Sequence, residues 1–186
     1  MSGSGDGPAA LAVVLAGGLS RRMGRPKAVV LLGGRPLVAW ALAAARAAGL
    51  EAVVVAKPGS ELPPLDVAVW EEPERPAHPL TGLVAALERA APRAVVALAC
   101  DMPFVTGDLI SRLAALDAVA AAPPGEAFPA RYAQSALPVL RAGLAREAAL
   151  RDVLAELDPV AISADSRALL GINDPEALRR AEASLR

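Results

Sequence analysis

Residues 10–27 read ALAVVLAGGLSRRMGRPK, and this stretch decides how the first half of the chain is expected to fold. Its first seven residues are apolar and rich in valine and leucine, which is typical of a buried β-strand. Glycines and basic residues follow directly, within residues 17–27. Because open α/β sheets bind their ligands beyond the carboxyl ends of the strands, this loop is predicted to lie at a binding site.

The composition of the loop favours a phosphate ligand. Gly17 and Gly18 allow the backbone to approach a ligand and to turn N–H groups toward it. The basic residues, which together match the charge of a triphosphate, are Arg21, Arg22, Arg25 and Lys27. The spacing fits neither a Walker A loop nor the GxGxxG of dinucleotide-binding folds. A turn with solvated surface arginines is the alternative explanation.

Strand-length apolar runs alternate with helical patterns along the rest of the chain. Strands are predicted at residues 51–56, 66–70, 94–99, 118–122 and 128–135, and helices at 36–48, 80–90, 106–116, 137–144, 150–157 and from 174 onward. This alternation predicts one α/β domain, residues 10–186, with a mainly parallel, Rossmann-like sheet in a three-layer arrangement. Residues 1–9 are expected to form a disordered tail.

Charge and composition argue against several classes of partner. The formal net charge is −1, and aromatic residues make up 3% of the chain, so neither nucleic acid nor a membrane surface is an expected partner. No apolar run reaches the ~20 residues of a spanning helix. A single cysteine, Cys100, suits a reducing compartment, and the start of the chain lacks the pattern of a secretory signal. A cytoplasmic protein is predicted.

Asp101 follows the apolar run VVALAC at residues 95–100, at the carboxyl end of a predicted strand. A carboxylate there lies in the same crevice as the loop at 17–27 and can hold Mg²⁺ together with substrate phosphates. The plainer explanation is an aspartate that caps the following turn. Cys100 is interpreted as a small buried strand residue and not as a nucleophile.

The segment LAGGLSRRMGRPK, residues 15–27, resembles the LAGGxSxRMGxxK signature of the molybdenum cofactor guanylyltransferases. Residues 100–103, CDMP, resemble the [CP]-D-x-P motif of the same family, in which the aspartate binds metal and nucleotide. The resemblance implies a nucleotidyltransferase fold, with Arg22, Lys27 and Asp101 as catalytic residues and Asp101 as the ligand of Mg²⁺. It places the nucleotide against Leu15, Ala16, Gly17, Gly18, Ser20, Arg21, Lys27 and Asp101.

A further part of the resemblance concerns the nucleobase. The stretch from Glu72 to Gly82 is similar to an acidic residue followed by G-P-L-x-G, which contacts guanine in the family. Pro79, Leu80 and Gly82 match, whereas His78 replaces the usual glycine. A carboxylate suits guanine, whose N1–H and amino group both donate. Glu71 and Glu74 are alternative acceptors, and an ordinary solvated loop explains the same composition.

Three residues are implied to face a second substrate. Arg131 lies in FPARY, Arg151 in LRDVL and Asn173 in NDPEAL, each of which resembles a family segment. At Lys57 the chain departs from the family, which often has an asparagine after that strand. Solvated positions on a helix face are the alternative explanation for the two arginines, and a capped helix start is the alternative explanation for Asn173.

The reaction implied by the resemblance is transfer of GMP from GTP to molybdopterin, with Mg²⁺ as cofactor and with release of pyrophosphate. Molybdoenzyme maturation proteins are the implied partners. The alternatives are a CTP-dependent molybdopterin cytidylyltransferase, a nucleotidyltransferase for another small metabolite, and a nucleotide-binding module without turnover. The presence of Lys27 and Asp101 together favours an enzyme, because binding alone does not require a metal-binding aspartate.

Overall fold

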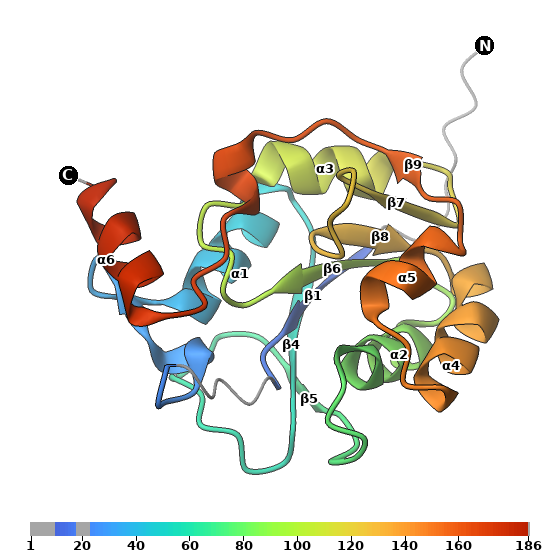
Figure 1. The fold of residues 1–186 in the computed structure, drawn as a ribbon, viewed down its shortest axis with the longest axis horizontal. Helices are drawn as coiled ribbons and strands as arrows, with labels where there is room; N and C mark the ends of the chain where they lie inside the picture. The colour runs from blue at the N-terminus through green and yellow to red at the C-terminus, as the bar shows by residue number, and fades with distance from the viewer. Residues whose placement is uncertain (1–9, 18–22, 186) are drawn as a thin grey trace.

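The computed structural model describes residues 10–17 and 23–185, so the predicted tail at 1–9 lies outside it. A seven-stranded sheet in the order β5-β4-β1-β6-β8-β7-β9 forms the centre (Figure 1). Within this sheet only β8 runs against its neighbours. The strands are β1 (Leu11–Leu15), β4 (Ala52–Ala56), β5 (Val69–Glu71), β6 (Val95–Ala99), β7 (Ala120–Ala122), β8 (Ala130–Tyr132) and β9 (Val160–Ala161). The predicted α/β domain with a mainly parallel sheet is confirmed.

Helices cover both faces of the sheet and make three layers (Figure 1). Successive strand residues point to opposite faces. Leu11 and Val13 of β1 therefore pack with α2, α4 and α5, while Ala12 and Val14 pack with α1 and α3. The helices are α1 (Leu37–Ala47), α2 (Pro79–Ala90), α3 (Gly107–Ala115), α4 (Leu137–Ala145), α5 (Leu150–Ala155) and α6 (Pro175–Ala183), with short 3-10 turns η1 (Lys27–Val29), η2 (Gln134–Ala136) and η3 (Ser166–Leu169).

A small hairpin, absent from the sequence prediction, packs against the C-terminal helix α6. It consists of β2 (Leu31–Leu32) and β3 (Arg35–Pro36), and its turn residues Gly33 and Gly34 have φ values of 56° and 77°. Glycine adopts such angles without strain. The hairpin and α6 share an apolar cluster made of Val30, Leu32, Leu37, Ile172 and Ala181. This packing holds the segment before α6 beside the segment before the hairpin.

The helices α3 and α6 begin with side-chain caps. The Thr106 hydroxyl accepts a hydrogen bond from the Leu109 N–H at 3.2 Å and begins α3. The Asp174 carboxylate accepts one from the Ala177 N–H at 2.8 Å and begins α6, with proline at the first helical position. Each cap satisfies a backbone N–H that has no partner inside its helix.

Replacing Thr106 with alanine is expected to lower the free energy of unfolding by about 1 kcal/mol, because the Leu109 N–H loses its acceptor. The measurement is the midpoint of urea unfolding at an unchanged m-value. Thr106→Ser keeps the hydroxyl and serves as the matched control. Equal stability of Thr106→Ala and Thr106→Ser would contradict a capping role.

The strands β5 and β8 differ most from their predicted bounds. β5 covers Val69–Glu71 instead of residues 66–70, because it pairs only with the carboxyl half of β4. β8 is limited to Ala130–Tyr132 within the predicted 128–135 by its antiparallel pairing with β6. The shift at β5 places Glu72 directly after the strand.

Across residues 10–17 and 23–185, no helix has the length and apolarity that crossing a bilayer requires.

Candidate active site

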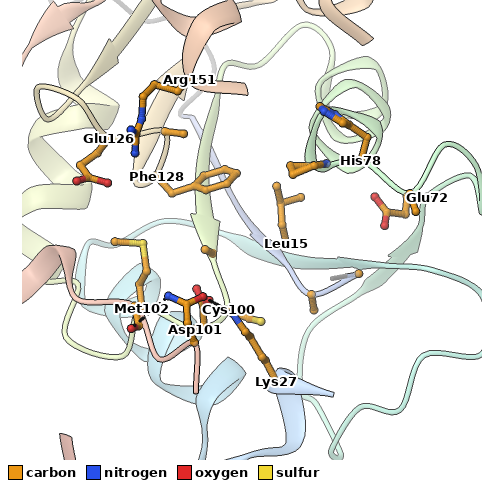
Figure 2. Close-up of a pocket in the computed structure, with 18 of the residues that line it drawn as sticks. Leu15, Lys27, Glu72, His78, Cys100, Asp101, Met102, Glu126, Phe128 and Arg151 are labelled. Atoms are coloured by element: carbon orange, nitrogen blue, oxygen red, sulfur yellow. Dashed lines mark hydrogen bonds and ion pairs between the residues drawn. The ribbon is translucent and has the colours of Figure 1, made fainter. Parts of the chain in front are cut away.

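A cavity of about 690 Å³ lies beyond the carboxyl ends of β1, β4, β5 and β6 (Figure 2). Parallel strands end at one edge of a sheet, so the polar residues that follow them meet there. Gly17 follows β1, Lys57 follows β4, Glu72 follows β5 and Asp101 follows β6, and all four line the cavity. The volume is in the range of sites for small molecules and cofactors.

Three polar side chains from distant segments meet on one wall of this cavity. The Lys27 ammonium lies 2.5 Å from Asp101 Oδ2 and donates to Asn173 Oδ1 at 2.7 Å. The Ile172 N–H donates to the Asp101 carbonyl oxygen at 2.8 Å, which ties the C-terminal segment to the end of β6. The predicted proximity of Lys27 and Asp101 is thus present in the structure, and Asn173 joins them.

On another wall, the Glu72 carboxylate fits between two glycines. A Cβ atom at Gly17 would lie 2.0 Å from Glu72 Oε1, and one at Gly82 would lie 2.2 Å from Oε2. Only hydrogen at both positions leaves room for this side chain, which is 7% exposed. Burial raises the pKa of Glu72, and the charge of Lys57 acts in the opposite direction.

Lys57 connects the end of β4 to the segment that follows β5. Its ammonium donates to the carbonyl oxygens of Pro73 at 3.0 Å and Glu74 at 2.9 Å, and it lies 3.6 Å from Glu72 Oε1. In the sequence, Lys57 is marked only by its departure from the asparagine that the family often has at this position. The available signal was its place as the first polar residue after a buried strand.

The opposite end of the cavity is lined by Glu126, Phe128 and Arg151 (Figure 2). Glu126 and Phe128 come from the loop between β7 and β8, and Arg151 comes from the first turn of α5. This end combines an acceptor, an aromatic ring and a guanidinium group. Arg151 was predicted from the sequence, whereas Glu126 had no distinguishing signal within its Pro- and Gly-containing loop.

Two residues near the cavity have structural explanations. His78 caps α2, because its Nδ1 accepts a hydrogen bond from the Leu80 N–H at 3.2 Å. Cys100 is buried, and burial raises the pKa of its thiol to about 12. A thiol that stays protonated is a poor nucleophile, which agrees with the interpretation of Cys100 as a packing residue.

Most of the predicted nucleotide contacts that the structure describes reach the cavity. The predicted nucleotide contacts that line it are Leu15, Ala16, Gly17, Lys27, Glu72, Pro79 and Asp101. Arg151 and Asn173, which were predicted to face the second substrate, line it as well. Gly82 lies behind Glu72, and Leu80 points into the core with none of its surface exposed, so neither forms the cavity wall. The predicted contacts Gly18, Ser20, Arg21 and Arg22 lie outside the described residues.

Arg131 is a correction to the sequence prediction. It pairs with Val96 of β6 and Ala121 of β7, and both belong to the core on the α1 and α3 side of the sheet. Its guanidinium donates to the Ala118 carbonyl oxygen, and its side chain is buried. Arg131 therefore supports the sheet and does not line the cavity that was expected to receive a second substrate.

The oxygen atoms around Lys27 fit a magnesium ion that arrives with a triphosphate. Asp101 and Asn173 direct a carboxylate and an amide oxygen at one positive charge, that of the Lys27 ammonium. Mg²⁺ uses hard oxygen ligands and takes most of its shell from phosphates and water, so few protein ligands are required. Within the described ranges no group of three His, Cys, Asp or Glu residues offers a separate metal site.

Comparison with known proteins identifies related sequences and folds. The model of the MobA-like NTP transferase domain matches residues 12–160. A molybdenum cofactor guanylyltransferase of Cereibacter sphaeroides is 37% identical over 191 residues, covering 94% of the chain and 96% of that protein. A probable molybdenum cofactor guanylyltransferase of Bacillus licheniformis is 39% identical over 106 residues; this match covers 54% of the chain and about half, 53%, of the relative's length.

The fold is also found among solved structures. The crystal structure of molybdopterin-guanine dinucleotide biosynthesis protein A from Archaeoglobus fulgidus matches with a TM-score of 0.75. The two sequences are 24% identical, and the match covers 94% of the chain and 98% of that protein. The three-layer nucleotidyltransferase fold expected from the sequence is thereby confirmed.

Proposed function

Because the chain belongs to the family of MobA-like NTP transferase domains, we propose that it transfers GMP from GTP to molybdopterin. The products are pyrophosphate and molybdopterin guanine dinucleotide. The observation that carries the proposal is the close contact between Lys27 and Asp101 in a cavity at the carboxyl edge of the sheet. A cation and a metal-binding carboxylate in one place are what a triphosphate substrate needs.

The transfer is a single displacement at phosphorus. An oxygen of the terminal phosphate of molybdopterin forms a bond to the α-phosphorus of GTP. The bond from that phosphorus to the oxygen bridging the β-phosphate breaks, and its electron pair leaves with pyrophosphate. The attacking phosphate is already anionic, so no side chain has to remove a proton. The rate then depends on positioning and on neutralising negative charge.

Lys27 supplies part of that neutralisation, since its ammonium is a compact charge able to donate to several phosphate oxygens. Arg22, which the family resemblance assigns to the phosphates, is proposed to share this role. Asp101 and Asn173 would hold Mg²⁺, which withdraws charge from the α-phosphate when bound. Lys27 then exchanges its present partners for the incoming phosphates.

The two ends of the cavity suit two heterocycles. Glu72 is proposed to accept hydrogen bonds from the N1–H and amino group of guanine, as the resemblance implies. At the other end, Phe128 offers a ring for stacking and Glu126 an acceptor for the amino group of the pterin. Arg151 is proposed to bind the phosphate of molybdopterin. Molybdoenzyme maturation proteins, which would receive the product, remain predicted partners.

The test is release of pyrophosphate by the purified chain with Mg²⁺, molybdopterin and either GTP, CTP or ATP. Turnover with GTP that requires molybdopterin would support the proposal. Preference for CTP would identify a cytidylyltransferase instead. Binding of GTP without any turnover would indicate a nucleotide-binding module.

Arg151→Ala is expected to raise the KM for molybdopterin by about 10- to 100-fold, since one charge-assisted hydrogen bond to phosphate contributes ~1.5–3 kcal/mol. The KM for GTP should stay unchanged, because Arg151 lies at the end of the cavity away from Glu72 (Figure 2). Steady-state kinetics with each substrate varied in turn measures both values. An equal rise in both KM values would argue against separate ends. Arg146→Ala, which removes an exposed ion pair with Glu156, is the control.

A further inference from the structure

Lys57 makes three contacts with one short segment of the chain. Its ammonium donates to the carbonyl oxygens of Pro73 and Glu74 and lies 3.6 Å from Glu72 Oε1. An ammonium group has three N–H donors. Two of them are used on the backbone of residues 73–74, and the third side of the group faces the Glu72 carboxylate. With 16% of its side chain exposed, Lys57 is held inside the site.

The Glu72 carboxylate is fixed from several directions. Its Oε1 occupies the space beside Gly17, and its Oε2 occupies the space beside Gly82. A Leu15 methyl group also lies 3.2 Å from the position of a Cβ at Gly82, so the neighbouring wall is apolar and close. Contacts with the loop after β1 and with α2 restrict the carboxylate sterically, while Lys57 attracts it by charge.

We propose that Lys57 is a positioning residue that sets the nucleobase preference of the site by holding Glu72 and the segment after it in place. The inference rests on the proposed function, because it assumes that Glu72 accepts hydrogen bonds from guanine. Lys57 acts through Glu72 and has no direct part in phosphoryl chemistry. The site selects guanine only while the carboxylate is both ionised and oriented.

Charge supports the same role. Burial raises the pKa of Glu72, and the ammonium of Lys57 lowers it. Among the described residues around the carboxylate, Gly17, Gly82 and Leu15 are uncharged, which leaves Lys57 as the charge that opposes the effect of burial. Without Lys57 the pKa of Glu72 is higher. On acidification the carboxylate is therefore protonated at a higher pH than in the wild type. A protonated carboxyl group has less capacity to accept from the N1–H of guanine.

The experiment measures binding of GTP and ITP with Mg²⁺ by calorimetry, from pH 6 to pH 9, in the full chain. Inosine lacks the 2-amino group, so the ratio of the two affinities reports on the carboxylate. Lys57→Met is expected to weaken GTP binding about tenfold and to bring the GTP and ITP affinities close together. The pH at which GTP affinity falls should move upward relative to the wild type. Lys57→Arg should restore much of both properties.

The matched control is Arg46→Met. Arg46 lies on α1 and carries the same charge as Lys57, in an exposed ion pair with Asp66. This variant should alter neither affinity nor the pH dependence. A merely structural role for Lys57 would lower the unfolding midpoint of Lys57→Met but leave its GTP-to-ITP ratio and pH profile like those of the wild type. That outcome would overturn the inference.

Failure of the proposed function looks different. If the wild-type chain binds neither GTP nor ITP, the assignment of the nucleotide site is wrong. If the wild type binds and discriminates while Lys57→Met does so equally well, only the role of Lys57 is wrong. Should Lys57→Met not fold, the same measurements are made on Lys57→Met combined with Glu72→Gln, which leaves no unpaired buried charge. Retained discrimination in that double variant would overturn both the assignment of Glu72 to guanine and the inference that rests on it.

Discussion

Asp101→Asn is expected to lower the rate of pyrophosphate release by about 10³-fold, or ~4 kcal/mol in the activation barrier. The substitution keeps the shape of the side chain and removes its charge. Asp101 is 15% exposed and lies against Lys27, so its charge both orients that ammonium and offers an oxygen to a metal. An amide retains an oxygen but holds a divalent cation less strongly, because it lacks the carboxylate charge.

The measurement is a single-turnover rate with saturating GTP, Mg²⁺ and molybdopterin. GTP binding should weaken much less than turnover, since part of the ground-state affinity comes from the base and from Lys27. Asp108→Asn is the matched control, because Asp108 forms an exposed ion pair with Arg112 on α3. An Asp101→Asn chain that kept full metal-dependent turnover would remove Asp101 from the mechanism.

The strands β1, β4 and β6 were predictable because they are buried on both faces. Runs such as VVV at residues 53–55 are β-branched and lie directly between two helical layers, so local preference and tertiary burial agree. The caps at Thr106 and Asp174 were predictable for a similar reason, because a side chain and a backbone N–H a few residues away are enough to form them.

The second half was harder, since alanine-rich segments carry little pattern. The run AAA at residues 120–122 became β7, and its direction relative to β8 depends on pairing, which apolarity does not reveal. The antiparallel register sets Arg131 opposite Val96, well before the carboxyl end of β6 at Ala99. An arginine expected at the ligand edge is therefore inside the sheet. The Gly33–Gly34 turn, by contrast, was a hairpin signal available in the sequence.

Some residues of the candidate site could also be predicted from the sequence, and others could not. Asp101 was predictable from its place directly after a buried strand, and Lys27 from the loop that carries it. The contact of Asn173 with Lys27 was not, because it spans 146 positions and depends on how α6 packs on the hairpin. The fit of Glu72 between Gly17 and Gly82 is also a property of three segments together. The role of these two glycines in making room for a carboxylate becomes visible when the three segments are folded together.

Gly82→Ala is expected to weaken GTP binding about 100-fold, or ~2.7 kcal/mol, through the Glu72 carboxylate. The new methyl group would lie 2.2 Å from Glu72 Oε2 and 3.2 Å from a Leu15 methyl carbon, closer than van der Waals contact allows. The carboxylate is the end of a flexible side chain, so it moves instead of the backbone. This movement takes the carboxylate out of its place between Gly17 and Gly82. Calorimetric titration with GTP and Mg²⁺ measures the effect.

Gly143→Ala provides the control for crowding as such. Gly143 is a helical glycine too, and its added methyl group would meet Val153 Cγ2 at 2.4 Å, in the packing of α4 on α5. Overpacking there should cost about 1–3 kcal/mol of stability and leave GTP affinity unchanged. In the Glu72→Ala background the space between the glycines is empty, so adding Gly82→Ala should weaken GTP binding no further. Additive losses in that double variant would mean that Gly82 acts independently of Glu72.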